Sequence, residues 1–173
     1  MSRLPFLLLL LPSLGCSDEP SAVSVPPTPE FTAGSGVVGE RLAQATFDID
    51  KKIKRINHDY DNWQVELKAK PALDIAVRRF TYPPESHTGW HRHPGPVLIQ
   101  VVQGTVTFYE APDCEKIEVS AGESYVDLGE HAHIGRNESL TETAQDVTVL
   151  FGPPGINPDA FRIDVTPAPV TCF

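Results

Sequence analysis

The sequence is poor in positive charge, and its apolar N-terminal stretch is too short to cross a membrane. Its 14 Lys and Arg against 23 Asp and Glu give a formal net charge of −9. This balance argues against nucleic acid as a partner, because nucleic acids bind clustered cations. The apolar stretch at residues 4–11 is far shorter than the ~20 residues of a spanning helix. The sequence also lacks a Ser-His-Asp elbow, a phosphate-cradling glycine loop and a Cys-x-x-Cys pair, so three common chemistries lack support.

The first residues have the features of an export signal. Arg3 precedes the apolar stretch, and residues 12–15 lead to Cys16, which predicts a signal peptide over residues 1–16. The Gly15-Cys16 pair resembles the bacterial lipoprotein processing site, although Ser13 stands where Leu is usual. The resemblance implies that Cys16 is lipidated and that this lipid is the protein's membrane contact. The alternative is ordinary signal cleavage nearby. We expect an exported protein of the periplasm or cell envelope.

A linker and one folded domain follow this leader. Residues 17–36 are rich in Ser, Pro, Thr and Gly, and such a composition cannot bury enough apolar area to fold, so we expect a flexible tether there. Residues 37–173 are long enough for one domain with its own core.

Cysteine is scarce, with three residues in the chain. If Cys16 carries lipid, Cys114 and Cys172 remain as an even pair in an oxidising compartment, which predicts a disulfide between them. Two free thiols are the alternative.

Period-two alternation predicts an all-β domain. Residues 63–69, 73–79 and 105–109 alternate apolar and polar side chains, whereas residues 97–102 form a nearly continuous apolar run, typical of a strand buried on both faces. Shorter strands are expected at residues 116–119, 124–128, 147–151 and 161–165. Weak helical character is confined to residues 37–45. Short strands separated by Gly and Pro favour a sandwich or closed barrel.

Histidine is concentrated in two short windows. Residues 87–96 contain His91-Arg92-His93, and residues 129–137 contain His131-Ala132-His133. On a strand, residues two apart project from the same face, so each pair can direct two imidazoles at one place. Neutral imidazole binds Fe, Zn, Mn, Ni and Cu, which predicts one divalent transition metal. The alternative is that these histidines form hydrogen bonds in a polar barrel mouth, and this applies most to His87.

The two windows resemble the two signature motifs of the cupin superfamily. Residues 89–104 match the first motif through their His-x-His pair and closing glycine, and residues 122–137 match the second, which ends in His133 and Asn137. The resemblance implies a single-domain jelly-roll β-barrel with a metal site in its mouth. It carries over His91, His93 and His133 as metal ligands.

The sequence departs from the family pattern in ways that affect the site. Val97 stands where these cupins usually have a glutamate ligand, and Leu128 stands where the second motif has proline. Without that carboxylate, three neutral imidazoles would hold the metal. His131 is a candidate fourth ligand. The alternative is that it faces solvent or lies outside the coordination shell.

Other residues near the motifs have two interpretations each. The aromatic side chains of Trp90, Phe108 and Tyr125 could line a ligand pocket or belong to the core. One of Glu123, Asp127 and Glu130 could act as a base, but no spacing distinguishes them. His58 lies in a polar stretch typical of a surface.

The sequence leaves three functions open. The first is a metal-dependent, dioxygenase-like enzyme of the cell envelope acting on a small anionic or chelating molecule. The second is a barrel that binds metal or a small-molecule ligand without catalysis, and the third is a lipoprotein with vestigial histidines. We favour a metal-binding protein whose reaction is undefined. The resemblance to cupins also implies a homodimer.

Overall fold

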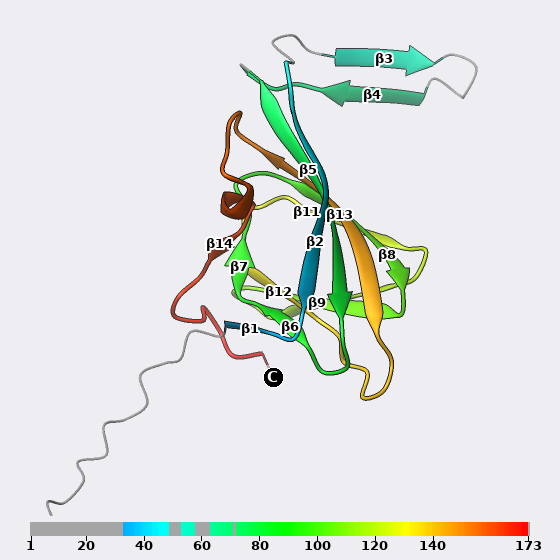
Figure 1. The fold of residues 1–173 in the computed structure, drawn as a ribbon, viewed down its shortest axis with the longest axis vertical. Helices are drawn as coiled ribbons and strands as arrows, with labels where there is room; N and C mark the ends of the chain where they lie inside the picture. The colour runs from blue at the N-terminus through cyan, green and yellow to red at the C-terminus, as the bar shows by residue number, and fades with distance from the viewer. Residues whose placement is uncertain (1–32, 49–52, 58–62, 71, 173) are drawn as a thin grey trace, which may run out of the picture.

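The structure is a computed structural model, and it describes residues 33–48, 53–57, 63–70 and 72–172. Within these residues it contains two larger antiparallel sheets, one separate hairpin and one short 3-10 helix (Figure 1). The predicted all-β class is therefore confirmed. None of the described residues belongs to a helix of sufficient length and hydrophobicity to span a membrane. The signal peptide, Cys16, most of the predicted linker and His58 lie outside the described residues.

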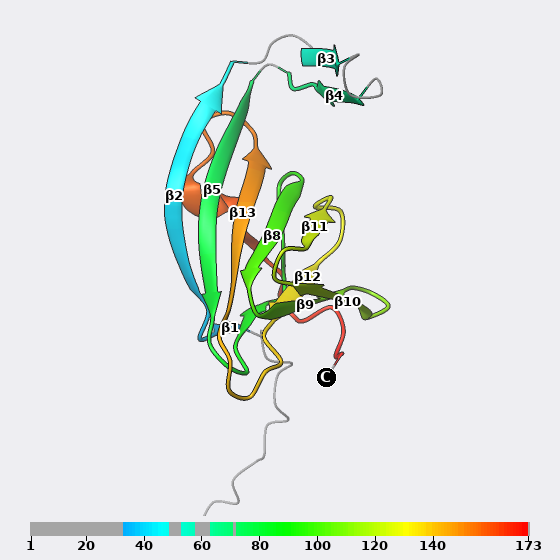
Figure 2. The same ribbon diagram turned by 90° about the vertical axis from the view of Figure 1, so that its right-hand side faces the viewer.

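The two larger sheets face each other across the core (Figure 2). The first sheet contains β1 (Ala33–Ser35), β6 (His87–Gly89), β12 (His133–Arg136), β7 (His91–Arg92), β14 (Ile163–Asp164), β9 (Thr105–Glu110) and β10 (Glu115–Ser120). The second contains β11 (Ser124–Asp127), β8 (Val97–Gln103), β13 (Ala144–Gly152), β5 (Leu73–Tyr82) and β2 (Val38–Phe47). The hairpin pairs β3 (Ile53–Asn57) with β4 (Trp63–Leu67), and the 3-10 helix is η1 (Pro158–Phe161).

Alternation along the central strands places one face of each in the core. Val97, Ile99 and Val101 of β8 are buried, whereas Leu98 and Val102 are exposed. The prediction that this apolar run is buried on both faces is therefore wrong, because the outer face of the second sheet is not covered there. On β13 the buried positions include the polar Asp146 and Thr148. Buried polar side chains need hydrogen-bond partners, so this part of the interior is not purely hydrophobic.

The structure overrides three sequence expectations, two through strand pairing and one through a short helix. The weak helical character of residues 37–45 is overruled because β2 pairs with β5 along its length, from Val38 to Phe47. The predicted linker ends earlier than residue 36, because β1 pairs with β6. The backbones of these two strands come so close at Gly34 that a Cβ there would lie 2.6 Å from the Thr88 carbonyl oxygen, so this position requires glycine. The strand predicted at residues 161–165 is reduced to β14, because η1 occupies the preceding residues.

The C-terminal tail packs on the first sheet and is covalently fastened there. The predicted disulfide between Cys114 and Cys172 is present, with Cα atoms 5.5 Å apart. Tail residues Val165, Ala168, Val170 and Cys172 pack against a second apolar cluster, made of Trp90, Tyr109 and Ile134. The tail therefore covers the face of the first sheet that points away from the cavity.

Candidate metal centre

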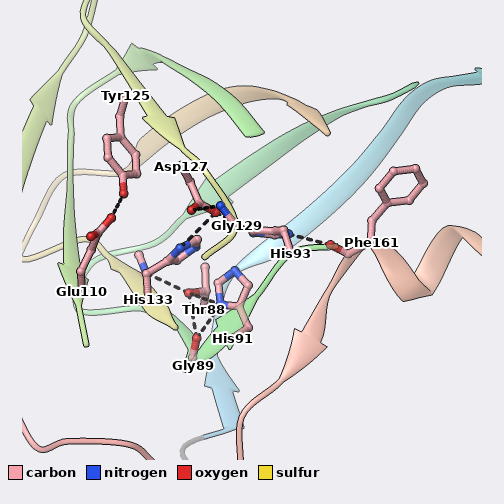
Figure 3. Close-up of polar contacts among 11 residues, drawn as sticks. Thr88, Gly89, His91, His93, Glu110, Tyr125, Asp127, Gly129, His133 and Phe161 are labelled. Atoms are coloured by element: carbon pink, nitrogen blue, oxygen red, sulfur yellow. Dashed lines mark hydrogen bonds and ion pairs between the residues drawn. The ribbon is translucent and has the colours of Figure 1, made fainter. Parts of the chain in front are cut away.

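Three of the predicted histidines meet inside the molecule. His133 on β12 lies opposite His91 on β7 in the strand register, and His93 follows β7 by one residue. Their ring centroids are 4.5 to 5.2 Å apart, and one nitrogen from each ring lies within 4.8 Å of the others (Figure 3). We call His91, His93 and His133 the histidine triad. It is a group that could hold one metal ion.

Backbone carbonyl groups fix the orientation of two triad rings. Nδ1 of His91 lies 2.8 Å from the carbonyl oxygen of Gly89, and Nδ1 of His93 lies 2.6 Å from that of Phe161. Because a carbonyl oxygen only accepts, each Nδ1 carries the proton and donates. Each Nε2 therefore has a free lone pair, which is the usual arrangement of a metal-ligating histidine.

The triad is neutral at physiological pH. Burial lowers the pKa of His91 well below its usual value, lowers the pKa of His93 to about 4 and lowers the pKa of His133 to about 3. The neighbouring triad rings lower the pKa values of His91 and His133 further, and the Arg162 guanidinium lowers the pKa values of all three histidines. Three imidazoles that are hard to protonate offer their lone pairs to a cation instead.

The triad forms one wall of a cavity between the two sheets. The cavity has about 520 Å³ of empty space, counted out to the solvent at its opening. Thr88, Phe108 and Gly135 of the first sheet lie on the same wall. The facing wall belongs to the second sheet, and its side chains are those of Arg78, Phe80, Tyr82, Val97, Ile99, Asp146, Thr148 and Leu150.

A buried acidic network lies on the facing wall. The Tyr82 hydroxyl donates to Oδ2 of Asp146 at 2.9 Å, and the Thr148 hydroxyl donates to Oδ1 at 2.8 Å. Burial raises the pKa of Asp146 to about 6, although these hydrogen bonds oppose the rise. Burial also raises the pKa of Tyr82, so its hydroxyl keeps its proton.

Two arginines add positive charge to the cavity. Arg162 donates to the carbonyl oxygen of Thr88 at 2.7 Å and to the carboxylate of Asp164 at 2.6 Å. Arg78 donates to the carbonyl oxygen of Pro158, and its buried Nε makes no hydrogen bond to the described residues. Both guanidinium groups line the cavity beside the neutral histidines.

The structure separates the three carboxylates that sequence reasoning could not distinguish. Glu123 and Glu130 are exposed, whereas Asp127 is buried beside the triad. Asp127 lies opposite Val97 in the register of β11 and β8, and no local sequence pattern identified this pairing. Burial raises the pKa of Asp127.

The remaining histidines do not join the triad. His131 is exposed and lines a separate surface hollow beside β11, so the structure does not bring the candidate fourth ligand to the group. Nδ1 of His87 on β6 accepts a hydrogen bond from the backbone N–H of Gly89 at 3.2 Å, as the hydrogen-bonding alternative expected.

The aromatic and asparagine candidates have different positions. Phe108 lines the cavity, and Tyr125 stacks on it with ring centroids 4.8 Å apart. Trp90 belongs to the cluster beneath the tail. The side-chain amide of the buried Asn137 donates to the carbonyl oxygens of Tyr82, Pro83 and Glu142, so Asn137 ties loops together and is not part of the cavity.

Fold and site together define a two-sheet β-barrel with a buried three-histidine group. No protein-family model matches this sequence, and no curated protein shows a significant match. Solved structures of cupin type are similar in strand arrangement. An oxalate oxidase in complex with the substrate analogue glycolate is 22% identical over 47% of this chain and 44% of its own, with a TM-score of 0.40.

Two further solved structures have similar TM-scores. A cupin superfamily protein from Desulfitobacterium hafniense is 9% identical over 60% of this chain and 80% of its own, with a TM-score of 0.41. A cupin-like protein from Thermotoga maritima is 18% identical over 43% of this chain and 55% of its own, with a TM-score of 0.40. The matched region spans less than half of the oxalate oxidase chain. Similarity at this level carries no information about ligand or reaction.

Proposed function

We propose that this protein binds one divalent transition metal through His91, His93 and His133. The observation that carries the proposal is the convergence of three buried, neutral imidazoles, with two rings already oriented by carbonyl groups. Nitrogen donors suit Fe, Zn, Mn, Ni and Cu, whereas Ca and Mg prefer oxygen. The buried Nδ1 of His133, which makes no hydrogen bond to the described residues, is a further polar atom that a cation or a water molecule would satisfy.

The proposal includes export. Arg3, the apolar residues 4–11 and the Gly15-Cys16 pair support delivery to the cell envelope, with a lipid anchor at Cys16. The disulfide between Cys114 and Cys172 supports an oxidising compartment.

A second candidate function is chemistry or capture of a small anionic molecule at the metal. Arg78 and Arg162 line the cavity together with the triad, and Asp146 and Tyr82 face the triad from the other sheet. A bound metal would supply Lewis-acid or oxygen chemistry. The guanidinium groups would hold and orient the anion, and Asp146 is a group that could accept or return a proton.

Elemental analysis tests the metal proposal. Protein purified from an envelope fraction is compared with a His91→Ala/His133→Ala variant and with His131→Ala, a matched control at an exposed histidine outside the triad. We expect about one equivalent of a transition metal in the wild type and in the control, and none in the double variant. Folded wild-type protein that takes up no metal after reconstitution would overturn the proposal.

A further inference from the structure

Asp127 faces the histidine triad from the opposite sheet. It ends β11, it is 4% exposed, and its Oδ1 accepts a hydrogen bond from the backbone N–H of Gly129 at 2.7 Å. Its other oxygen, Oδ2, lies 3.4 Å from Nδ1 of His133 and 3.9 Å from Nε2 of His93 (Figure 3). One carboxylate oxygen is therefore anchored by the backbone, and the other is directed at two triad rings.

The facing atoms of Asp127 and His133 lack hydrogen-bond partners among the described residues. Oδ2 of Asp127 and Nδ1 of His133 are both buried, and neither makes a hydrogen bond to the described residues. Buried polar groups are nearly always paired in proteins, and a buried carboxylate oxygen is especially unfavourable without a partner. A cation held by both atoms would satisfy them together.

The distances suit shared coordination of one ion. Ligand atoms that each lie about 2.1 Å from a tetrahedral metal are separated from one another by about 3.4 Å. Oδ2 lies 3.4 Å from the His133 nitrogen and 3.9 Å from the His93 nitrogen. The ligand atoms that all lie within 4.8 Å of one another are those of the three histidines, and Oδ2 of Asp127 lies beside two of these rings, His133 and His93.

The charge of a bound dication also favours a carboxylate ligand. Three neutral imidazoles leave the full charge of a dication in a buried site, and Val97, which lines the cavity opposite Asp127 in the register, cannot offset it. We propose that Asp127 is a fourth protein ligand of this site, so that three imidazole nitrogens from one sheet and one carboxylate oxygen from the other hold the ion. This inference rests on the proposed metal function.

The test uses Co(II) as the probe, because its visible spectrum reports the ligands around it. Affinity is measured by competition with a chelator for the wild type, Asp127→Asn and Glu130→Gln, the last being an exposed carboxylate nearby in the chain. Thermal unfolding of each metal-free protein checks the fold. We expect Asp127→Asn to bind Co(II) about 10- to 100-fold more weakly and to change its visible spectrum, while Glu130→Gln matches the wild type.

Each alternative outcome is informative. Wild-type affinity and spectrum in Asp127→Asn would overturn the inference while leaving the triad proposal intact. Weaker binding with an unchanged spectrum would also overturn it, and would make Asp127 a residue that orients His133. Asp127→Glu keeps a carboxylate, so we expect it to bind more tightly than Asp127→Asn; equal loss in both would contradict a carboxylate ligand. Folded wild-type protein that binds no Co(II) would instead refute the proposed function.

Discussion

Replacing Asp146 by asparagine should stabilise the protein near neutral pH. The Asp146 carboxyl is 1% exposed, and burial raises its pKa from 3.8 to about 6. Between these two values the unfolded chain releases a proton that the folded protein keeps. The folded state therefore binds more protons, and its stability falls as pH rises through the window. The raised pKa of Asp146 lowers the free energy of unfolding by about 3 kcal/mol at pH 7 relative to low pH. About 1.6 kcal/mol of this stability is already lost at pH 5.

Urea unfolding at pH 5 and pH 7 in the presence of chelator measures this effect. The asparagine oxygen can accept from Thr148, and its amide can donate to the Tyr82 hydroxyl, so both contacts have a replacement. We expect the stability of Asp146→Asn relative to the wild type to improve by about 1 kcal/mol between pH 5 and pH 7. Asp113→Asn, at an exposed carboxyl, is the matched control and should show no such trend. A pH-independent difference for Asp146→Asn would refute the reasoning.

Three further predictions concern the metal and the disulfide. Metal at about a hundred times its dissociation constant should stabilise the folded protein by about 2.7 kcal/mol, raising the Tm by about 5 to 10 °C; an unchanged Tm by calorimetry would indicate vestigial histidines. Because burial lowers the pKa values of His93 and His133 to about 4 and about 3, metal affinity should fall less than tenfold from pH 7 to pH 5.5. Three ordinary histidines would lose several hundred-fold through protonation over that range, so a loss of that size by chelator competition would contradict the buried triad. A Cys114→Ser/Cys172→Ser variant should lose about 4 kcal/mol in denaturant unfolding, since the bridge closes a loop with a sequence separation of 58; wild-type stability would contradict this estimate.

The triad could be predicted from sequence because its geometry is mostly local. His91 and His93 are two residues apart in the chain, and strand alternation predicts a common direction for them. In the structure β7 ends at Arg92, and His93 reaches the triad from the position just after the strand. The addition of His133 required the resemblance of its window to the second cupin motif. The structure adds the register of β7 and β12, which places His133 opposite His91.

The positions of Asp127 and His131 relative to the triad could not be predicted from the sequence. His131 is two residues from His133 and was expected on the same face, but β12 begins only at His133, so alternation does not extend back to residue 131. Asp127 comes to the triad from a different sheet. Its position depends on the pairing of β11 with β8 and on the distance between the sheets, and neither is encoded in a local pattern.

The tail fastened by the disulfide has a consequence for the metal binding that we propose. Trp90 precedes His91 and Ile134 follows His133, and both of these neighbours are buried in the cluster that the tail covers. The strands that carry two of the triad histidines are thus packed from outside, whatever occupies the cavity. The fold itself therefore positions the imidazoles, and a metal ion bound as we propose would not have to order them. Under that proposal, metal loading and release would be reversible exchange on an intact barrel, without the coupled folding that smaller metal-binding domains require.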